Sequence, residues 1–172
     1  GTSSTPIGNS TSRAFRGTFD GNNHTISNLN LSASASAQAL FGYTNGAEIS
    51  NLTVRGTNQG TYQSAGIVGN ATNTVIYNCV NYVTFSVSSY QRGGIVGSAT
   101  GCTINECTNN ANFTASYGSG GIVGEATNTE ITDCINNGNL TTASYNIGGI
   151  VGRLLTSSTI SGCINYGTIT TT

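Results

Sequence analysis

Five cysteines are the most reactive side chains of this 172-residue chain. Converging thiolates bind zinc and neighbouring thiols form disulfides, so the spacing of the cysteines indicates which of these is possible. Four of them recur about every 28 residues, and leucines hold the same place earlier in the chain: Cys79, Cys107, Cys134 and Cys163, after Leu29 and Leu52. One thiol per repeat does not converge on a point, so we expect small, buried, reduced side chains and no metal site. Cys102 lies outside this column, and it either pairs with Cys107 or stays free.

Carboxylates are the second candidates for chemistry. Glu106 and Asp133 take the same place in neighbouring repeats, where two acids could form a general acid/base pair or a calcium site. No third acid and no arginine joins them, so we expect no catalytic residue, no metal and no cofactor. Glu125 and Arg153 also share a column, which predicts a surface ion pair worth about 0–1 kcal/mol.

A column of tyrosines is the most informative feature for binding. Each tyrosine lies four residues before a recurring glycine: Tyr62, Tyr90, Tyr117 and Tyr145. Exposed aromatic side chains in a row can hold sugar rings or another protein. Stacked aromatic side chains often serve the fold alone, and we favour this structural interpretation while the binding one remains open. These four residues are the candidate ligand-binding site.

Threonines also fall into columns. The first column is complete, and two places further on a second one is partial: Thr72, Thr100, Thr127 and Thr156, then Thr74 and Thr129. A flat, uncharged threonine face would resemble that of an ice-binding solenoid. Cys102 and Ser158 interrupt the second column, so we favour ordinary strand surface, for which threonine is well suited.

The element that must position all these columns is a repeat built on the block Gly-Ile-Val-Gly. It occurs four times, with a weaker copy at Ala39–Gly42: Gly66–Gly69, Gly94–Gly97, Gly121–Gly124 and Gly149–Gly152. A fixed period of about 27–28 residues indicates a repeat architecture. The repeats have short β-branched and aromatic stretches between turn-forming residues, which are typical of strands and not of helices. The sequence therefore predicts an all-β, right-handed parallel β-helix with three short strands per rung and five to six rungs.

Two further columns should form the interior of this solenoid. An isoleucine column is expected to stack in the core, extended backwards by Ile49 and Ile26: Ile76, Ile104, Ile131 and Ile160. An asparagine column follows each cysteine by two residues: Asn81, Asn109, Asn136 and Asn165. Identical stacked amides can satisfy one another, so this column predicts a hydrogen-bonded ladder rather than a ligand-binding row.

The chain is expected to form a single solenoid domain over residues 1–172. Residues 1–14 are interpreted as a lead-in or partial cap, 15–46 as a first long rung and 47–172 as regular repeats. Natural proteins cover open sheet edges, and the last repeat carries no covering helix. We therefore expect either neighbouring domains in a larger surface protein or a repeat that docks end to end.

Composition limits the classes of partner. Only 6% of the residues are charged and the net charge is −1, so no basic patch favours nucleic acid. No apolar run reaches the roughly 18 residues of a membrane span, so membrane insertion is not expected. The surface must consist of Asn, Thr, Ser and Gly, which suits an extracellular or bacterial cell-surface protein.

Several blocks together resemble GLUG-type repeat regions of bacterial surface adhesins and IgA-protease-type surface proteins. They are Gly-Gly-Ile-Val-Gly, Ile-x-x-Cys-x-Asn, and residues 6–8, 15–29, 39–43 and 47–54. The resemblance implies the non-catalytic repeat part of such proteins, with a surface location and a host glycan or protein as partner. It carries over no catalytic residue, and His24, the only histidine, cannot form a His-Glu-x-x-His zinc motif. We expect a non-enzymatic scaffold or adhesion module; the alternatives are a carbohydrate-active β-helix enzyme and an ice-binding solenoid.

Overall fold

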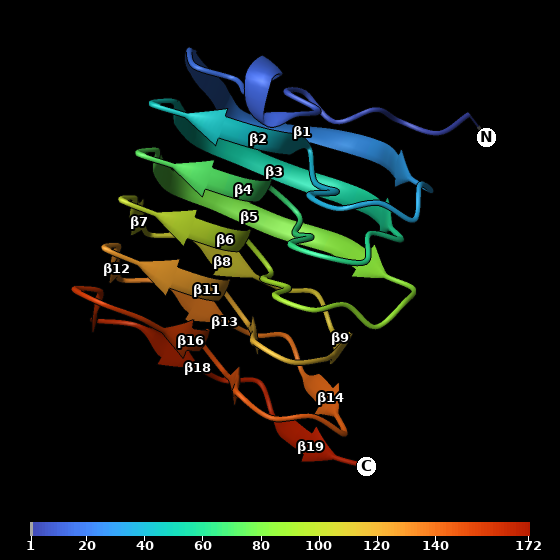
Figure 1. The fold of residues 1–172 in the computed structure, drawn as a ribbon, viewed down its shortest axis with the longest axis vertical. Coiled ribbons are helices and arrows are strands. Elements are labelled where there is room, and N and C mark those ends of the chain that lie inside the picture. Colours follow the sequence, from blue (N-terminus) through green and yellow to red (C-terminus); the bar gives the residue numbers. More distant parts are fainter. Residues whose placement is uncertain (1) are drawn as a thin grey trace.

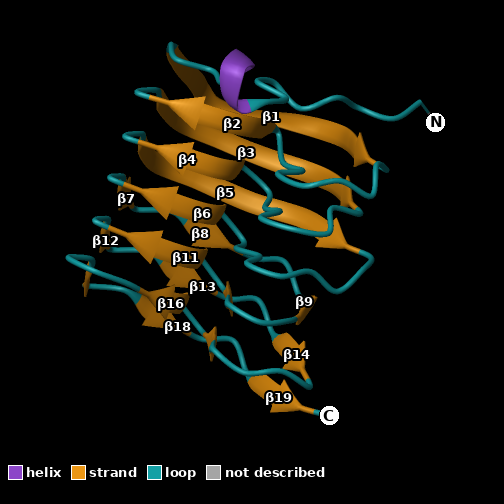
Figure 2. Cartoon of the chain, in the orientation of Figure 1, coloured by secondary structure: helices purple, strands orange, loops and turns teal. Residues whose placement is uncertain are grey.

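A computed structural model describes residues 2–172, and they form a parallel β-solenoid of about six turns (Figure 1). Successive turns stack from the N-terminal to the C-terminal end, and nearly all regular structure is strand (Figure 2). One short 3₁₀ helix, η1 (Thr11–Arg13), lies at the N-terminal end. The predicted all-β parallel solenoid is confirmed. No helix in the described part of the chain is long and apolar enough to cross a membrane.

The first sheet is built from the second half of the Gly-Ile-Val-Gly block and the residues after it. Its five parallel strands are β2 (Phe41–Asn45), β4 (Val68–Thr72), β6 (Val96–Thr100), β11 (Val123–Thr127) and β16 (Val151–Leu154). Phe41 is in register with Val68, and the remaining strands continue this column with Val96, Val123 and Val151. Their side chains are buried up to the last turn, which makes this sheet one wall of the core.

The strands of the second sheet become shorter along the solenoid. Three long strands come first, β1 (Thr18–Leu31), β3 (Glu48–Asn58) and β5 (Val75–Phe85). Each later turn has two short strands in their place: β7 (Thr103–Asn105) with β8 (Thr108–Asn109), β12 (Glu130–Thr132) with β13 (Ile135–Asn136), and β17 (Thr159–Ser161) with β18 (Ile164–Asn165). All of these strands pair in parallel with the turns above and below.

Two smaller sheets lie in the last three turns, whereas the same part of the earlier turns has single bridges such as Ser36 with Tyr62. The third sheet contains β9 (Phe113–Ala115), β14 (Leu140–Thr142) and β19 (Ile169–Thr171). A two-stranded sheet contains β10 (Ser119–Gly120) and β15 (Ile147–Gly148). Figure 1 shows β9, β14 and β19 continuing the turns beyond the second sheet, on the side away from β7 and β12.

The isoleucine column is confirmed, and it lies in the core. Ile49, Ile76, Ile104, Ile131 and Ile160 are in register across five strands. The first four are fully buried, whereas Ile160, in the last turn of the structure, is 40% exposed. The predicted extension to Ile26 is wrong, since Phe19 pairs with Ile49 and Ile26 pairs with Val54. Two bulges in β1 shift the register, and the left-handed residues Asn22, Asn23 and Asn28 lie at them.

Each turn bends at three places where the backbone is left-handed. Residues with positive φ recur there in columns: Gly46, Asn73, Gly101, Asn128 and Ser157; Asn51, Asn78, Glu106, Asp133 and Gly162; Ala37, Gln63, Gln91, Gly118 and Asn146. Glycine adopts this conformation freely and Asn and Asp tolerate it better than other residues. The abundance of Asn and Gly in the sequence therefore has a local structural cause.

The N-terminal segment lies beside part of the first sheet. Ile7 forms a parallel bridge with Phe41, and Phe15 forms one with Thr44. Phe15 and Phe19 also pack their rings against Phe41, with centroids 5.1 and 5.3 Å apart. Gly1, the first residue of the expected lead-in or partial cap, lies outside the described residues.

Candidate functional site

The asparagine column forms a buried amide ladder, which confirms the prediction. Three Nδ2–H···Oδ1 bonds of 2.8 Å join the four asparagines of successive turns, from Asn81 to Asn109, from Asn109 to Asn136 and from Asn136 to Asn165. Asn109 Oδ1 also accepts from the backbone N–H of Ala111, and its Nδ2 donates to the Ala111 carbonyl. The amides are thus satisfied within the fold, and no ligand is needed to complete them.

The first glycine of each Gly-Ile-Val-Gly block lies directly against this ladder. A Cβ added at Gly94 would lie 2.3 Å from Asn109 Cγ, and one at Gly121 would lie 2.3 Å from Asn136 Cγ. Such distances are far below van der Waals contact, so only glycine fits. The most conspicuous motif of the sequence is therefore explained by packing against the ladder.

The acidic column lies at one of the bends. Glu106 and Asp133 are exposed, and each has a left-handed backbone, with φ of 52° for both. At the same bend in earlier turns, Asn78 donates to Asn51 and Asn51 donates to Asp20, with distances of 2.8 and 2.9 Å. The bond from Asn51 holds the pKa of Asp20 below its ordinary value. Within residues 2–172, no group of three or more His, Cys, Asp or Glu side chains could hold a metal.

All five cysteines are free. Cys79, Cys102, Cys107 and Cys134 are buried, but Cys163 is only partly buried, so its predicted inaccessibility is wrong. Cys163 lies in the last turn of the structure, whereas the other four cysteines lie in turns that have a neighbouring turn on either side. Burial raises the pKa of Cys102, Cys107 and Cys163, whereas a hydrogen bond with Cys107 lowers the pKa of Cys134.

The tyrosine column is on the surface. Tyr62, Tyr90 and Tyr145 are 41%, 57% and 71% exposed, and Tyr117 is partly buried. Backbone bridges align Tyr62 with Tyr90, and the rings of Tyr117 and Tyr145 meet edge to face with centroids 5.0 Å apart. We call these four residues the tyrosine ridge. The structure brings them into one row along the solenoid but leaves their role open.

A row of polar side chains accompanies the tyrosine ridge, and the sequence analysis foresaw only its last pair. Asn70 donates to Gln63, Gln63 to Gln91, and Gln91 to Glu125, with distances of 3.0, 3.2 and 2.8 Å. Arg153 completes the row through the predicted ion pair with Glu125. Its guanidinium also lies 5.2 Å from the centre of the Tyr117 ring. A hydrogen-bonded row of polar side chains therefore runs across several turns, and it contacts the tyrosine ridge where Arg153 meets Tyr117.

The threonine columns do not share one face. Thr74 and Thr129 are 1% exposed, and their hydroxyls donate to the carbonyls of Thr72 and Thr127. They point inward because the left-handed bend at Asn73 and Asn128 separates them from the strand before it. The flat double row of threonines considered for ice binding is absent from these turns.

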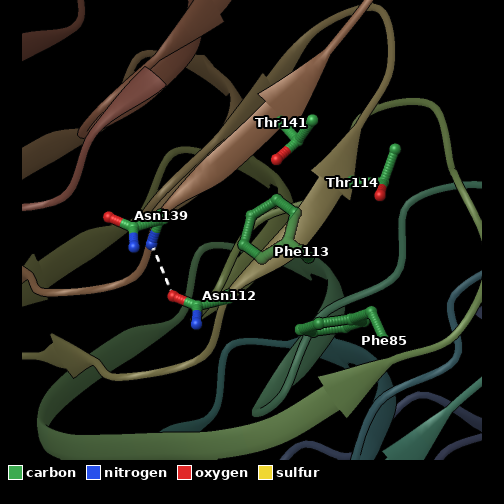
Figure 3. Close-up of a pocket in the computed structure, with 6 residues that line it drawn as sticks. All are labelled: Phe85, Asn112, Phe113, Thr114, Asn139 and Thr141. Carbon is green, nitrogen blue, oxygen red and sulfur yellow. Dashed lines mark hydrogen bonds between the residues drawn. The ribbon is translucent and has the colours of Figure 1, made fainter. Parts of the chain in front are cut away.

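A groove of about 430 Å³ lies on the outer side of the third sheet, and sequence reasoning missed it. Its lining residues come from three consecutive turns: Phe85, Asn112, Phe113, Thr114, Asn139 and Thr141. Figure 3 shows the Phe113 ring at its centre, with the two threonines on one side and the two asparagines on the other. The backbone N–H of Asn139 donates to Asn112 Oδ1 over 2.7 Å, which fixes that side chain. We call this feature the groove.

A buried arginine lies beneath the groove. Arg92 is fully buried, and its guanidinium lies 4.5 Å from the centre of the Phe85 ring and 5.9 Å from that of Phe113. It donates to the carbonyls of Gly60, Val87 and Thr114 and to the Ser64 hydroxyl. Burial lowers the pKa of Arg92 to about 9, so it remains charged at neutral pH. In the sequence, Arg92 is the only charged residue between Arg55 and Glu106. That isolation was the one feature from which a buried arginine could have been predicted.

Comparison of the chain with models of protein families, with curated proteins and with solved structures found no match.

Proposed function

We propose that this chain is a non-enzymatic scaffold and adhesion module of a bacterial cell-surface or secreted protein. Its partner is a host glycan or protein that binds along the tyrosine ridge. The resemblance to GLUG-type repeat regions supports the surface location and the adhesive role.

The observation that carries the proposal is the exposure of the tyrosine ridge on a regular backbone. Stacked turns lie about 4.8 Å apart, so neighbouring rings present a nearly continuous strip. Tyrosine has few rotatable bonds and offers both an apolar face and a hydroxyl, which suits recognition. Each contact is weak alone, but several on one rigid support act together.

Stepwise replacement of the tyrosines tests this assignment. We expect binding to fall progressively in glycan and host-protein binding assays as tyrosines are changed to serine. The series is Tyr145→Ser alone, then Tyr145→Ser with Tyr90→Ser, and then both with Tyr62→Ser. Tyr166→Ser is the matched control, because Tyr166 is 68% exposed and lies outside the ridge. Equal binding by the triple variant and the unchanged protein would refute the role of the ridge. Antibody labelling of intact cells tests the surface location separately.

A further inference from the structure

The groove arises where the regular stacking of turns is interrupted. Asn81 is in register with Asn109, and unbroken pairing would place Val87 opposite Ala115. Instead, Ser89 bridges Ala115, so two additional residues must be accommodated after Phe85. The edge of β9 (Phe113–Ala115) that faces β5 (Val75–Phe85) therefore lacks a continuous neighbouring strand.

Arg92 stabilises this interruption from inside. The equivalent places in the adjacent turns, two residues before Gly66 and Gly121, hold the small residues Ser64 and Ser119. The larger arginine side chain donates from Nη1 to both Val87 and Thr114, and so joins the two sides of the gap. It introduces a positive charge directly beneath the groove.

No acid compensates this charge. The one ion pair within residues 2–172 is that of Glu125 with Arg153, on the first sheet. All six acids of the chain lie on the first sheet, in the first part of the second sheet or at the bend that follows it: Asp20, Glu48, Glu106, Glu125, Glu130 and Asp133. None lies between that bend and the tyrosine ridge, where the groove is.

A second positive charge lies on the same side of the solenoid. Arg55 is exposed on β3 (Glu48–Asn58), and its guanidinium lies 3.9 Å from the centre of the Tyr82 ring. Tyr82 precedes Phe85 by three residues on β5, which corresponds to about 10 Å along a strand. One buried arginine beneath the groove and one exposed arginine on the second sheet thus lie on this side of the solenoid, while the acids lie elsewhere.

The lining of the groove has the chemistry of a sugar site. Thr114 and Thr141 offer exposed hydroxyls, Asn112 and Asn139 offer amides, and Phe85 offers a partly exposed ring. Hydroxyls and amides bind sugar hydroxyls, and an aromatic side chain packs on the C–H face of a sugar ring. A volume of about 430 Å³ lies within the usual range of small-molecule sites.

We propose that the groove binds an acidic carbohydrate, namely a sugar residue that carries a carboxylate or a sulfate. The threonine hydroxyls, the asparagine amides and the Phe85 ring contact the sugar, while Arg55 and the buried Arg92 attract its charge. Charges near a low-dielectric wall act over longer distances than charges in water, so Arg92 contributes without touching the ligand. This site is separate from the tyrosine ridge, and it does not require the function proposed for the ridge.

Titration of the protein with an oligouronate, its methyl ester and a sulfated oligosaccharide tests this proposal. Calorimetry should show that an acidic form binds at least about tenfold more tightly than the neutral ester at low salt, and the difference should shrink as salt screens the charges. The two acidic probes distinguish carboxylate from sulfate recognition. Equal affinity for the ester, or no binding of any probe at millimolar concentration, would overturn the proposal.

Two pairs of variants locate the site. Thr141→Tyr should fill the groove and reduce affinity at least about tenfold, whereas Thr170→Tyr, at the register partner one turn away and outside the groove, should not.

Arg55→Gln should reduce affinity for the acidic probe about three- to tenfold, whereas Arg16→Gln removes the same charge from the exposed N-terminal segment and should have little effect. Equal losses within either pair would show that binding is non-specific. Because the Tyr62, Tyr90 and Tyr145 variants should retain this binding, failure of one proposal is distinguishable from failure of the other.

Discussion

The asparagine ladder and the tyrosine ridge are both columns with one residue per turn, yet they have opposite environments. Asn109 is fully buried, and its amide bonds join the turns on either side. Tyr145 is 71% exposed and packs mainly on a neighbouring tyrosine of the ridge. Regular repetition in a solenoid therefore does not separate structural columns from binding columns. What separates them is whether the neighbouring atoms leave the side chain any contact with solvent.

The largest effect should follow from adding one methyl group beside the ladder. In Gly121→Ala the new Cβ would lie 2.1 Å from the Gly149 carbonyl oxygen, so the backbone of two turns must move. We expect a loss of about 3–5 kcal/mol in the free energy of unfolding, measured by chemical denaturation. Gly17→Ala is the control, because its nearest neighbour is a flexible ring edge at 3.4 Å. Similar losses in the two variants would refute the close packing at the ladder.

Removal of one amide should have the next largest effect. Asn109→Ala deprives Asn81 and Asn136 of a partner and leaves the Ala111 N–H without its acceptor. Buried polar groups without partners are costly, so we expect about 2–4 kcal/mol of destabilisation. Asn110→Ala, at the next position, removes only the exposed bond from Asn137 and should cost under about 1 kcal/mol. A ladder that tolerates Asn109→Ala as well as Asn110→Ala would not be a structural column.

The cysteines allow the contrast between interior and surface to be measured without destabilising the fold. A maleimide reagent should modify Cys163 first in the native protein, and all five cysteines only after denaturation. Because burial raises the pKa of Cys163, the rate should continue to rise above pH 9, the region of an ordinary thiol. Rapid modification of Cys79 or Cys107 in the native state would contradict the burial of the column.

The same thiols predict how stability depends on pH. Burial raises the pKa of Cys107 well above its ordinary value of about 9. Below pH 9 this thiol is neutral in both the folded and the unfolded chain, so its contribution to stability is fully present. Above pH 9 the unfolded chain loses its proton first, and that contribution is lost as the pH rises towards the folded value. Cys107→Ala should flatten the decline in unfolding free energy above pH 9.

The smallest effect on stability should come from the tyrosine ridge. Tyr90→Ser should change the free energy of unfolding by no more than about 0.5 kcal/mol, since the ring is largely in solvent. Tyr117→Ser should cost more, because it removes contacts with Tyr145 and Arg153. Thermal unfolding of the two variants measures this difference. Unfolding of the Tyr90→Ser protein would place the ridge among the structural columns.

Much of the architecture could be predicted because residues at the same place in successive repeats lie next to one another in successive turns. The period, the isoleucine column, the ladder and the ion pair of Glu125 with Arg153 all follow from one alignment of the turns. That alignment failed in the first turn, where bulges in β1 replace the regular register. It also placed Glu106 and Asp133 in one column without giving a reason for the acids, and the structure shows that they occupy left-handed bends in a column with asparagines and a glycine. The groove escaped prediction because it depends on one irregular turn.

The sequence by itself determined which residues stack on which, because each turn repeats the same apolar and polar positions at a fixed period. Only the tertiary structure decided whether the threonine and tyrosine columns face inward or outward and where the stacking is interrupted. Both depend on backbone bends and on neighbouring turns, so they are not encoded in the period. The left-handed residues direct Thr74 inward, and Arg92 occupies a serine place and changes the pairing around it. The tyrosine ridge and the groove are products of these three-dimensional contacts.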